Sequence, residues 1–296
     1  MSLRQSLHFV VTHPINRRRL SRGLLDWAAW QAKSRLQPGP HVCTWIAGTH
    51  LWARRGETGI TGSLYAGLHE FEDMAFALHV LRPQSLFVDV GANAGSYSVL
   101  AAGVAGSRVI ALEPVPATYS RLVANLELNA LTDRVRALNV AAGSADGALA
   151  FTSDSDVMNH AVTAADNTSE SIVVPVSRID DVLASETPEL VKVDVEGYEY
   201  AVIDGGPKCF SAAGANCVLV ELNGSGARYG WGDEQVAQLL FAAGYSTYAY
   251  EPFTRKLELR GREVRAEGNT LFIRDAQRAQ ALVSQAPRFS IKGVML

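Results

Sequence analysis

The ten residues from 86 to 95 constrain the fold of this chain more than any other segment. They read Leu-Phe-Val-Asp-Val-Gly-Ala-Asn-Ala-Gly, and a helical pattern begins near Ser96. An apolar run that ends in Asp89 and is followed by Gly91 and Gly95 predicts a strand, a tight turn and a helix start. Glycine allows such a turn because it adopts backbone dihedrals closed to other residues. We therefore expect Asp89 at the carboxyl end of a parallel strand, where open α/β sheets bind their ligands.

The spacing within this segment separates two kinds of cofactor. A dinucleotide site has the pattern G-x-G-x-x-G and seats a pyrophosphate on a helix N-terminus. Here Asn93 takes the middle position, and Asp89 would repel a pyrophosphate but suits the ammonium group of S-adenosylmethionine. Glu113 follows 24 residues after Asp89, at the end of a second apolar strand, where an acid is expected to meet ribose hydroxyls. The alternative is that both acids only cap helices.

Strands and helices alternate after this segment, which predicts a mostly parallel sheet with helices on both faces. Between two further strands, 148–151 and 172–176, the polar stretch 152–171 is expected to be a loop. Near the end, 245–250 and 270–274 are expected to form a hairpin pair. The other expected elements are helices at 116–129, 179–185 and 233–243 and strands at 134–141, 190–195 and 217–221.

The flanking regions divide the chain into four parts: 1–40, 41–81, 82–275 as the catalytic domain, and a tail at 276–296. Residues 1–37 are rich in arginine and predict a basic amphipathic helix. Such a helix can lie on an anionic membrane surface. The alternative is that residues 1–37 are an appendage packed on the domain or on a dimer partner. Short strands with glycine turns are expected over 41–67, and a helix over 70–81.

The composition narrows the class of protein. The chain has 296 residues, 48% of them hydrophobic and 19% charged, and a net charge of −3. These values are typical of a globular protein and disfavour a general nucleic-acid binder. The three cysteines lack metal-ligand spacing, and the sequence shows no long apolar run and no secretion-type leader. These features predict a cytoplasmic protein. Contact with the inner face of the membrane is a further expectation. Homo-oligomerisation is left open.

Acidic side chains end further strands of the expected sheet. Alternation along 190–195 places Lys192 and Asp194 on one face, and Glu221 ends the next core strand. We take Asp194 as the first candidate for a general base or for orienting the acceptor hydroxyl, and His160, on the polar loop, as the second. Lys192 either tunes Asp194 or contacts the acceptor. Glu196 and Glu199 either take part in the site or cap the following helix. A magnesium or calcium site built by Asp194, Glu221 and Asn223 is the less favoured alternative.

These motifs together resemble the FkbM family of methyltransferases. The chain carries the family's D-V-G-A-N-x-G loop, the Glu113-Pro114 pair, and a K-V-D-V-E-G-Y-E segment at 192–199. The likeness runs from about residue 65 to 274 and includes the ends 65–70 and 269–274. It implies a seven-stranded class I methyltransferase fold and methyl transfer from S-adenosylmethionine, which leaves S-adenosylhomocysteine. The implied acceptor is a hydroxyl of a sugar or glycan, or of a polyketide-type metabolite.

One departure from the family is Asn223, where the family often has a histidine two residues after the fifth-strand glutamate.

The motifs and the likeness assign three sets of site residues. The expected cofactor-binding residues are Glu70, Asp89, Gly91, Asn93, Gly95, Tyr97, Glu113, Pro114, Ala141 and Asp194; the expected acceptor-binding residues are Tyr65, Asn159, His160, Glu196, Glu221 and Asn223; and the expected catalytic residues are Asp194, His160 and Lys192.

Three other functions are weighed against this one. A nicotinamide-dependent oxidoreductase shares the sheet but is disfavoured by Asn93 and by the acid before the loop. An N-methyltransferase acting on an amine or a protein would have the same cofactor half. A binding or scaffold protein without catalysis would have a damaged cofactor site, whereas this one is intact in sequence.

Overall fold

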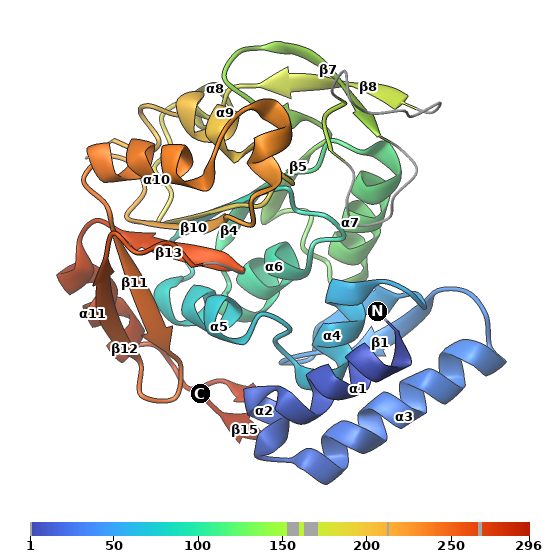
Figure 1. Ribbon diagram of the computed structural model, residues 1–296. Helices are drawn as coiled ribbons and strands as arrows, with labels where there is room; N and C mark the ends of the chain where they lie inside the picture. The colour runs from blue at the N-terminus through green and yellow to red at the C-terminus, as the bar shows by residue number, and fades with distance from the viewer. Residues whose placement is uncertain (1, 153–159, 163–170, 212, 266–267) are drawn as a thin grey trace.

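A sheet of eight strands forms the centre of the molecule, with helices on both of its faces (Figure 1). The computed structural model describes residues 2–152, 160–162, 171–211, 213–265 and 268–296. In spatial order the strands are β12 (Lys256–Gly261), β11 (Ser246–Glu251), β13 (Asn269–Ile273), β10 (Cys217–Glu221), β9 (Leu190–Val193), β3 (Leu86–Val90), β4 (Arg108–Leu112) and β5 (Val135–Leu138).

The five strands β5, β4, β3, β9 and β10 are parallel, and β13, β11 and β12 add antiparallel pairs at one edge. This is the α/β class I methyltransferase architecture that the sequence predicts, with one strand more. The additional strand is β12, which pairs with β11 and is largely exposed. The expected pairing of 245–250 with 270–274 is present as β11 and β13, but β12 lies between them in sequence, so the two strands are not joined as a direct hairpin.

Side chains of the central strands alternate between two hydrophobic cores. Phe87 points into a core with α5, α7 and α11, whereas Val88 and Val90 point into a core with α8, α9 and α10. Both faces are therefore buried, as the near-continuous apolar runs of these strands require. The helices are α1 (Leu3–Thr12), α2 (Pro14–Arg17), α3 (Leu20–Leu36), α4 (Thr58–Ala66), α5 (Phe71–Val80), α6 (Ser96–Val99), α7 (Pro116–Leu128), α8 (Ile179–Leu183), α9 (Glu199–Asp204), α10 (Asp233–Ala242) and α11 (Ala276–Ser284), with a π-helical turn η1 (Leu100–Ala105) and a 3₁₀ turn η2 (Ser225–Tyr229).

The N-terminal region differs from expectation in two ways. Residues 1–37 form three helices rather than one, because the chain turns at His13, whose buried ring is 2.7 Å from the carbonyl oxygen of Leu68. Residues 41–67 begin with the expected strands, β1 (His41–Thr44) and β2 (His50–Ala53), but continue as α4. Gly59 and Gly62 within α4 lie against the His69 side chain, so these glycines serve close packing rather than turns.

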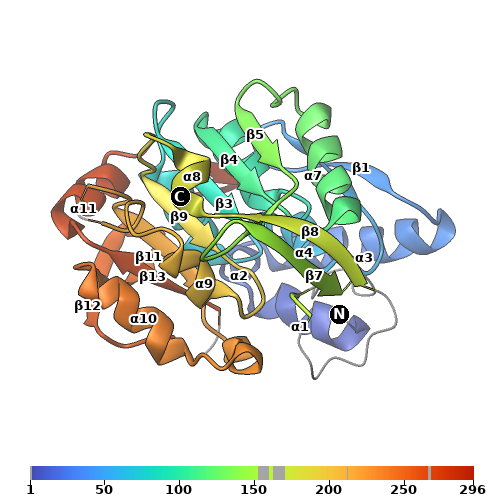
Figure 2. The same ribbon diagram turned by 90° about the horizontal axis from the view of Figure 1, so that it is seen from above.

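Two smaller units complete the chain. A three-stranded sheet joins β6 (Ala141–Ala142), β8 (Ser171–Ser177) and β7 (Gly147–Thr152), and it lies beside the carboxyl end of the main sheet (Figure 2). The expected tail 276–296 is ordered: it contains α11, β14 (Ser290–Ile291) and β15 (Val294–Met295), and Ile291 is fully buried in the main core. Among the described helices, none has the length and apolar content needed to cross a bilayer.

Candidate active site

A crevice opens at the carboxyl ends of β3, β4 and β9. It consists of two adjoining cavities that share Gly91, Asn93 and Asp194. The first, on the β4 side, is lined mainly by Glu113, Pro114, Val115, Thr118, Val140, Ala141, Phe151, Glu196 and Tyr198. The second, below α4, is lined mainly by Glu57, Thr58, Ile60, His69, Glu70, Asp89, Tyr97, Arg121 and Lys192.

The glycine loop passes directly over the end of β9. Gly91 has φ +80°, and a Cβ atom placed on it would lie 1.8 Å from the carbonyl oxygen of Asp194. Asn93 also adopts a left-handed conformation, with φ +48°, which asparagine tolerates better than most residues. Gly95, with φ +86°, begins α6 and packs against Leu122. The loop thus holds β3 and β9 together at the centre of the crevice.

Glu113 ends β4 and is fixed by backbone amides. One of its carboxylate oxygens accepts a hydrogen bond from the amide of Asn93 and the other from that of Val115, each at 3.0 Å. Burial raises the pKa of Glu113 to about 7, and the two amides oppose this rise. The carboxyl group therefore faces the first cavity in a fixed orientation.

Lys192 lies fully buried among carboxylates on the other side of the loop. Its Nζ is 2.6 Å from Oδ2 of Asp194 and 4.8 Å from the ring centre of Tyr97. Burial alone would lower the pKa of Lys192, but the charges of Asp194, Glu70 and Asp89 raise it above the ordinary value. Lys192 is therefore a fixed cation and not a proton carrier.

Two of these carboxylates are held by hydroxyl groups of the helix that follows the loop. Asp89 is buried, and it accepts a hydrogen bond of 2.7 Å from Ser98. Glu70 accepts one of 2.5 Å from the hydroxyl of Tyr97. Burial raises the pKa of Asp89; it acts in the same direction on Glu70, but His69 and Lys192 outweigh it and hold the pKa of Glu70 well below its usual range.

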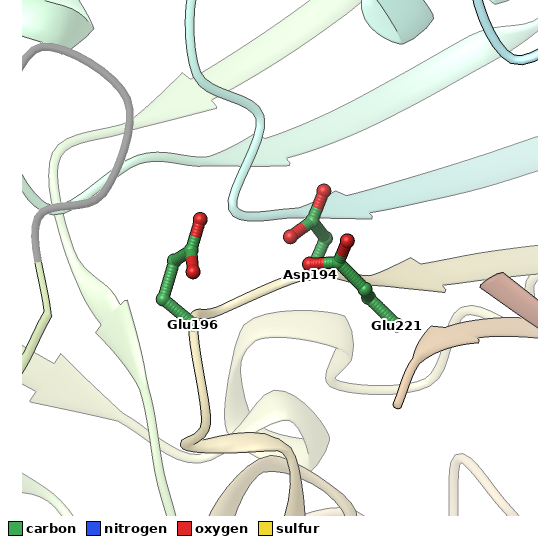
Figure 3. Close-up of side chains that lie close together, drawn as sticks. All are labelled: Asp194, Glu196 and Glu221. Atoms are coloured by element: carbon green, nitrogen blue, oxygen red, sulfur yellow. The ribbon is translucent and has the colours of Figure 1, made fainter. Parts of the chain in front are cut away.

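Three carboxyl groups gather where β9 and β10 end. Asp194, Glu196 and Glu221 each place an oxygen within 4.8 Å of the others, and Figure 3 shows Asp194 and Glu221 approaching each other while Glu196 lies further along the turn. Burial and the charge of Asp194, to which Glu221 is hydrogen-bonded, raise the pKa of Glu221 to about 9. Glu221 and Asp194 therefore retain a shared proton more readily than two isolated carboxyl groups would.

The turn after β9 is shaped by an unusual backbone. Glu196 has φ +54°, and Gly197, with φ +106°, lies so close to Ser225 that a side chain would overlap its carbonyl. Glu199 stabilises this turn, because its Oε1 accepts hydrogen bonds from the amides of Val195 and Gly197. Glu199 thus has a structural part here, whereas Glu196 lines the crevice.

The structure brings most of the sequence-predicted site residues to the crevice and leaves some outside it. Tyr65 is buried, accepts a hydrogen bond from Gln31 and faces a separate recess. Asn223 is exposed and caps the turn at Ser225. These two placements correct the expectation of a role in the crevice. His160 lies beside β7, where its amide bonds Thr152, and Asn159 falls outside the described residues.

Sequence reasoning missed one ion pair in the crevice. Glu57, just before α4, lies 2.7 Å from Arg121 of α7, and both side chains are largely buried. No spacing rule connects residues so far apart in the chain. The segment before Thr58 was moreover expected to be a strand, so no signal marked Glu57.

Comparisons with known proteins identify the family of this chain. Residues 89–247, more than half of the chain, match the family model of the methyltransferase FkbM domain. The chain therefore belongs to the FkbM family of methyltransferases. The matched range contains the glycine loop, Glu113, and the 192–199 segment.

Individual relatives are more distant. Methyltransferase 1 of Beauveria bassiana (strain ARSEF 2860) is 29% identical over 160 residues, which are 46% of this chain and 64% of that protein. The crystal structure of methyltransferase FkbM from Methylobacillus flagellatus KT superposes with a TM-score of 0.45 and 16% identity, over 74% of this chain and 55% of that one. P. horikoshii TYW2 in complex with MeSAdo gives a TM-score of 0.41 and 14% identity, over 79% and 69%. The chain thus spans less than two thirds of the curated relative.

Proposed function

We propose that this chain is an S-adenosylmethionine-dependent O-methyltransferase whose acceptor is a hydroxyl of a sugar or glycan, or of a polyketide-type metabolite. The observation that carries the proposal is the position of Asp194. Its carboxyl group borders both cavities of the crevice and is ion-paired with Lys192. A carboxylate held at this point can orient an acceptor hydroxyl toward a donor in the crevice.

The residues of the crevice suit such a donor. Glu113 would bind ribose hydroxyls, and the apolar wall of Val115, Ala141 and Phe151 would contact the base. Asp89 and Glu70, on the other side of the loop, would face the positively charged methionine part. S-adenosylmethionine supplies an electrophilic methyl group when bound.

The acceptor needs positioning and help with its proton. In the proposed step the acceptor oxygen gains the methyl group and loses its hydrogen to Asp194, from which the proton passes to solvent. Lys192 keeps the carboxylate of Asp194 in place, and Glu221 is hydrogen-bonded to the same carboxylate. Such base assistance contributes about 10²–10⁴-fold in rate.

Two alternatives share this geometry. An amine acceptor would be attracted by the same carboxylates, so a panel of hydroxyl and amine acceptors is needed to separate O- from N-methylation. A divalent cation could also be bound by Asp194, Glu196 and Glu221. The metal-free alternative is favoured because Lys192 already places a cation 2.6 Å from Oδ2 of Asp194. Turnover that is lost with EDTA and restored by Mg²⁺ would contradict it.

The first experiment is a calorimetric titration of the purified protein with S-adenosylhomocysteine. We expect one-to-one binding that disappears in Glu113→Ala, with circular dichroism confirming that the variant is folded. Binding of NADH in place of S-adenosylhomocysteine would overturn the proposal.

A matched pair of variants tests the catalytic assignment. Asp194→Asn removes the base, and we expect turnover to fall about 10²–10⁴-fold while S-adenosylhomocysteine still binds. Glu221→Gln retains a neutral hydrogen-bond donor next to Asp194, so turnover at pH 7 should stay within a few-fold of normal. Equal losses in both variants would show that Glu221 is needed as much as Asp194 and would overturn the assignment of Asp194 as the base.

A further inference from the structure

The N-terminal helices carry a charge opposite to that of the remaining chain. Residues 1–37 contain seven arginines and lysines and one acid, Asp26, which gives a net charge of +6. Because the whole chain carries −3, the remainder carries −9. The helices α1, α2 and α3 lie together at one end of the molecule (Figure 1), so the positive charge is concentrated there.

Most of these cations have no carboxylate partner among the described residues. Asp26 is shared by Arg19 and Lys292. Within the part of the chain that the structure describes, six exposed cations of this region form no ion pair. Arg18 lies over the ring of Phe253, and we call the other five the basic face: Arg4, Arg17, Arg22, Lys33 and Arg35. Unpaired cations at this density favour an anionic partner.

The same helices leave an apolar stripe uncovered. Leu25, Ala29, Ala32 and Leu36 follow one another at intervals of four, three and four residues, so they share one side of α3. All four are exposed, Leu25 to 67% and Leu36 to 81%. The opposite side of α3 is buried through Trp30 and Ser34, which makes α3 a helix with a packed side and an uncovered apolar side.

A recess lies at the edge of this surface. It has a volume of about 240 Å³ and lies between α1, α3 and the start of α4. Arg35 and Arg55 contribute cations to it, and Trp30 and Tyr65 contribute aromatic walls. Leu3, which is 52% exposed, forms part of its rim. Cationic and aromatic side chains beside exposed leucines suit a phosphate head group above an apolar layer.

We propose that α1 and α3 dock on an anionic lipid bilayer, with the basic face at the head groups and Leu25 and Leu36 in the interface. Helices of this kind lie in the plane of the membrane surface and do not span it. A second copy of the chain is the other candidate occupant. A symmetric dimer through this face would place the two basic faces against each other, and like charges oppose such contact.

Docking in this way would bring the active site close to the membrane. The recess is lined by Arg55 and Gly56, and the crevice by the residues that follow directly, from Glu57 to Ile60. One short segment therefore separates this recess from the crevice. An acceptor attached to lipid would reach the crevice from the same end of the molecule.

Vesicle sedimentation with the full chain tests the proposal without any acceptor or donor. We expect the protein to pellet with vesicles of phosphatidylcholine and phosphatidylglycerol at a ratio of 3:1 but not with phosphatidylcholine alone, and the binding to weaken at high salt. The variant R22E/K33E/R35E should reduce partitioning by about 100-fold or more, since the loss of each basic residue alone costs about fivefold and each substitution also adds a negative charge. The variant L25S/L36S should reduce it by about tenfold or more.

A matched control carries the same change of charge elsewhere. K208E/K256E/R260E alters exposed cations outside this surface and should leave vesicle binding almost unchanged. Melting temperature and S-adenosylhomocysteine titration check that each variant is folded. Equal loss in the control, or no preference for anionic vesicles, would overturn the proposal. A dimer in sedimentation velocity that L25S/L36S abolishes, without vesicle binding, would assign the surface to self-association instead.

Discussion

The two sides of the crevice are built in different ways. On the β4 side a single carboxyl group, Glu113, is held by the amides of Asn93 and Val115. On the α4 side Lys192 is buried among the charges of Asp194, Glu70 and Asp89, which come from different elements. The first side depends on local backbone geometry, whereas the second depends on a balance of charges. We therefore expect the second side to fail as a unit when its buried cation, Lys192, is removed.

The largest effect should come from Gly91, one of the residues that line both sides of the crevice. Gly91→Ala would place a methyl group inside the carbonyl of Asp194 and a side chain at φ +80°. We expect loss of S-adenosylhomocysteine binding and destabilisation by about 3 kcal/mol or more, measured by urea unfolding. Gly147→Ala, where no atom lies within 4 Å of the added methyl, is the control and should change little. A stable Gly91→Ala variant with normal binding would disprove the close approach of the two strands.

Removal of the buried cation should break only the second side. Lys192→Met leaves Asp89 and Asp194 without their counter-charge, and we expect a loss of about 3–5 kcal/mol at pH 7 together with loss of turnover. The loss should shrink at pH 5, because the stranded carboxylates take up protons. Urea unfolding at both pH values measures this, with the exposed Lys208→Met as control. A loss independent of pH would indicate a packing defect instead.

The smallest effect is expected at the turn after β9. Burial raises the pKa of Glu199 from 4.5 to about 7, so its neutral form favours folding below about pH 4.5 and this contribution is lost as the pH rises to 7. Glu199→Gln keeps the oxygen that accepts from Val195 and Gly197 but never ionises. We expect it to gain up to about 3 kcal/mol over wild type between pH 5 and pH 8. Exposed Glu234→Gln should show no such trend in parallel unfolding curves.

The predictions from sequence were best where the signal is local. Asp89, Gly91, Glu113 and the segment from Lys192 to Glu199 were found because strand ends, glycine turns and alternation operate over a few residues. The parallel orientation of the core strands was predicted from the alternation of strands and helices along the chain.

The sequence predicted less where packing between distant segments decides. Glycines in α4 looked like turn residues, but they lie against His69. Tyr65 is buried against Gln31 of α3, a contact 34 residues away, and Glu57 meets Arg121 across an even longer interval. Edge strand β12 was missed because its side chains are mostly exposed and give no core-facing pattern.

The carboxylates around Lys192 also bear on how the proposed enzyme would release its product. The donor enters as a sulfonium cation and leaves, after transfer, as an uncharged thioether. Asp89, Asp194 and Glu70 attract the first more than the second, because only the first carries the additional positive charge. The same side chains that favour binding of S-adenosylmethionine would thus bind S-adenosylhomocysteine less tightly. Exchange of product for donor between turnovers would then be driven by electrostatics rather than by a conformational change.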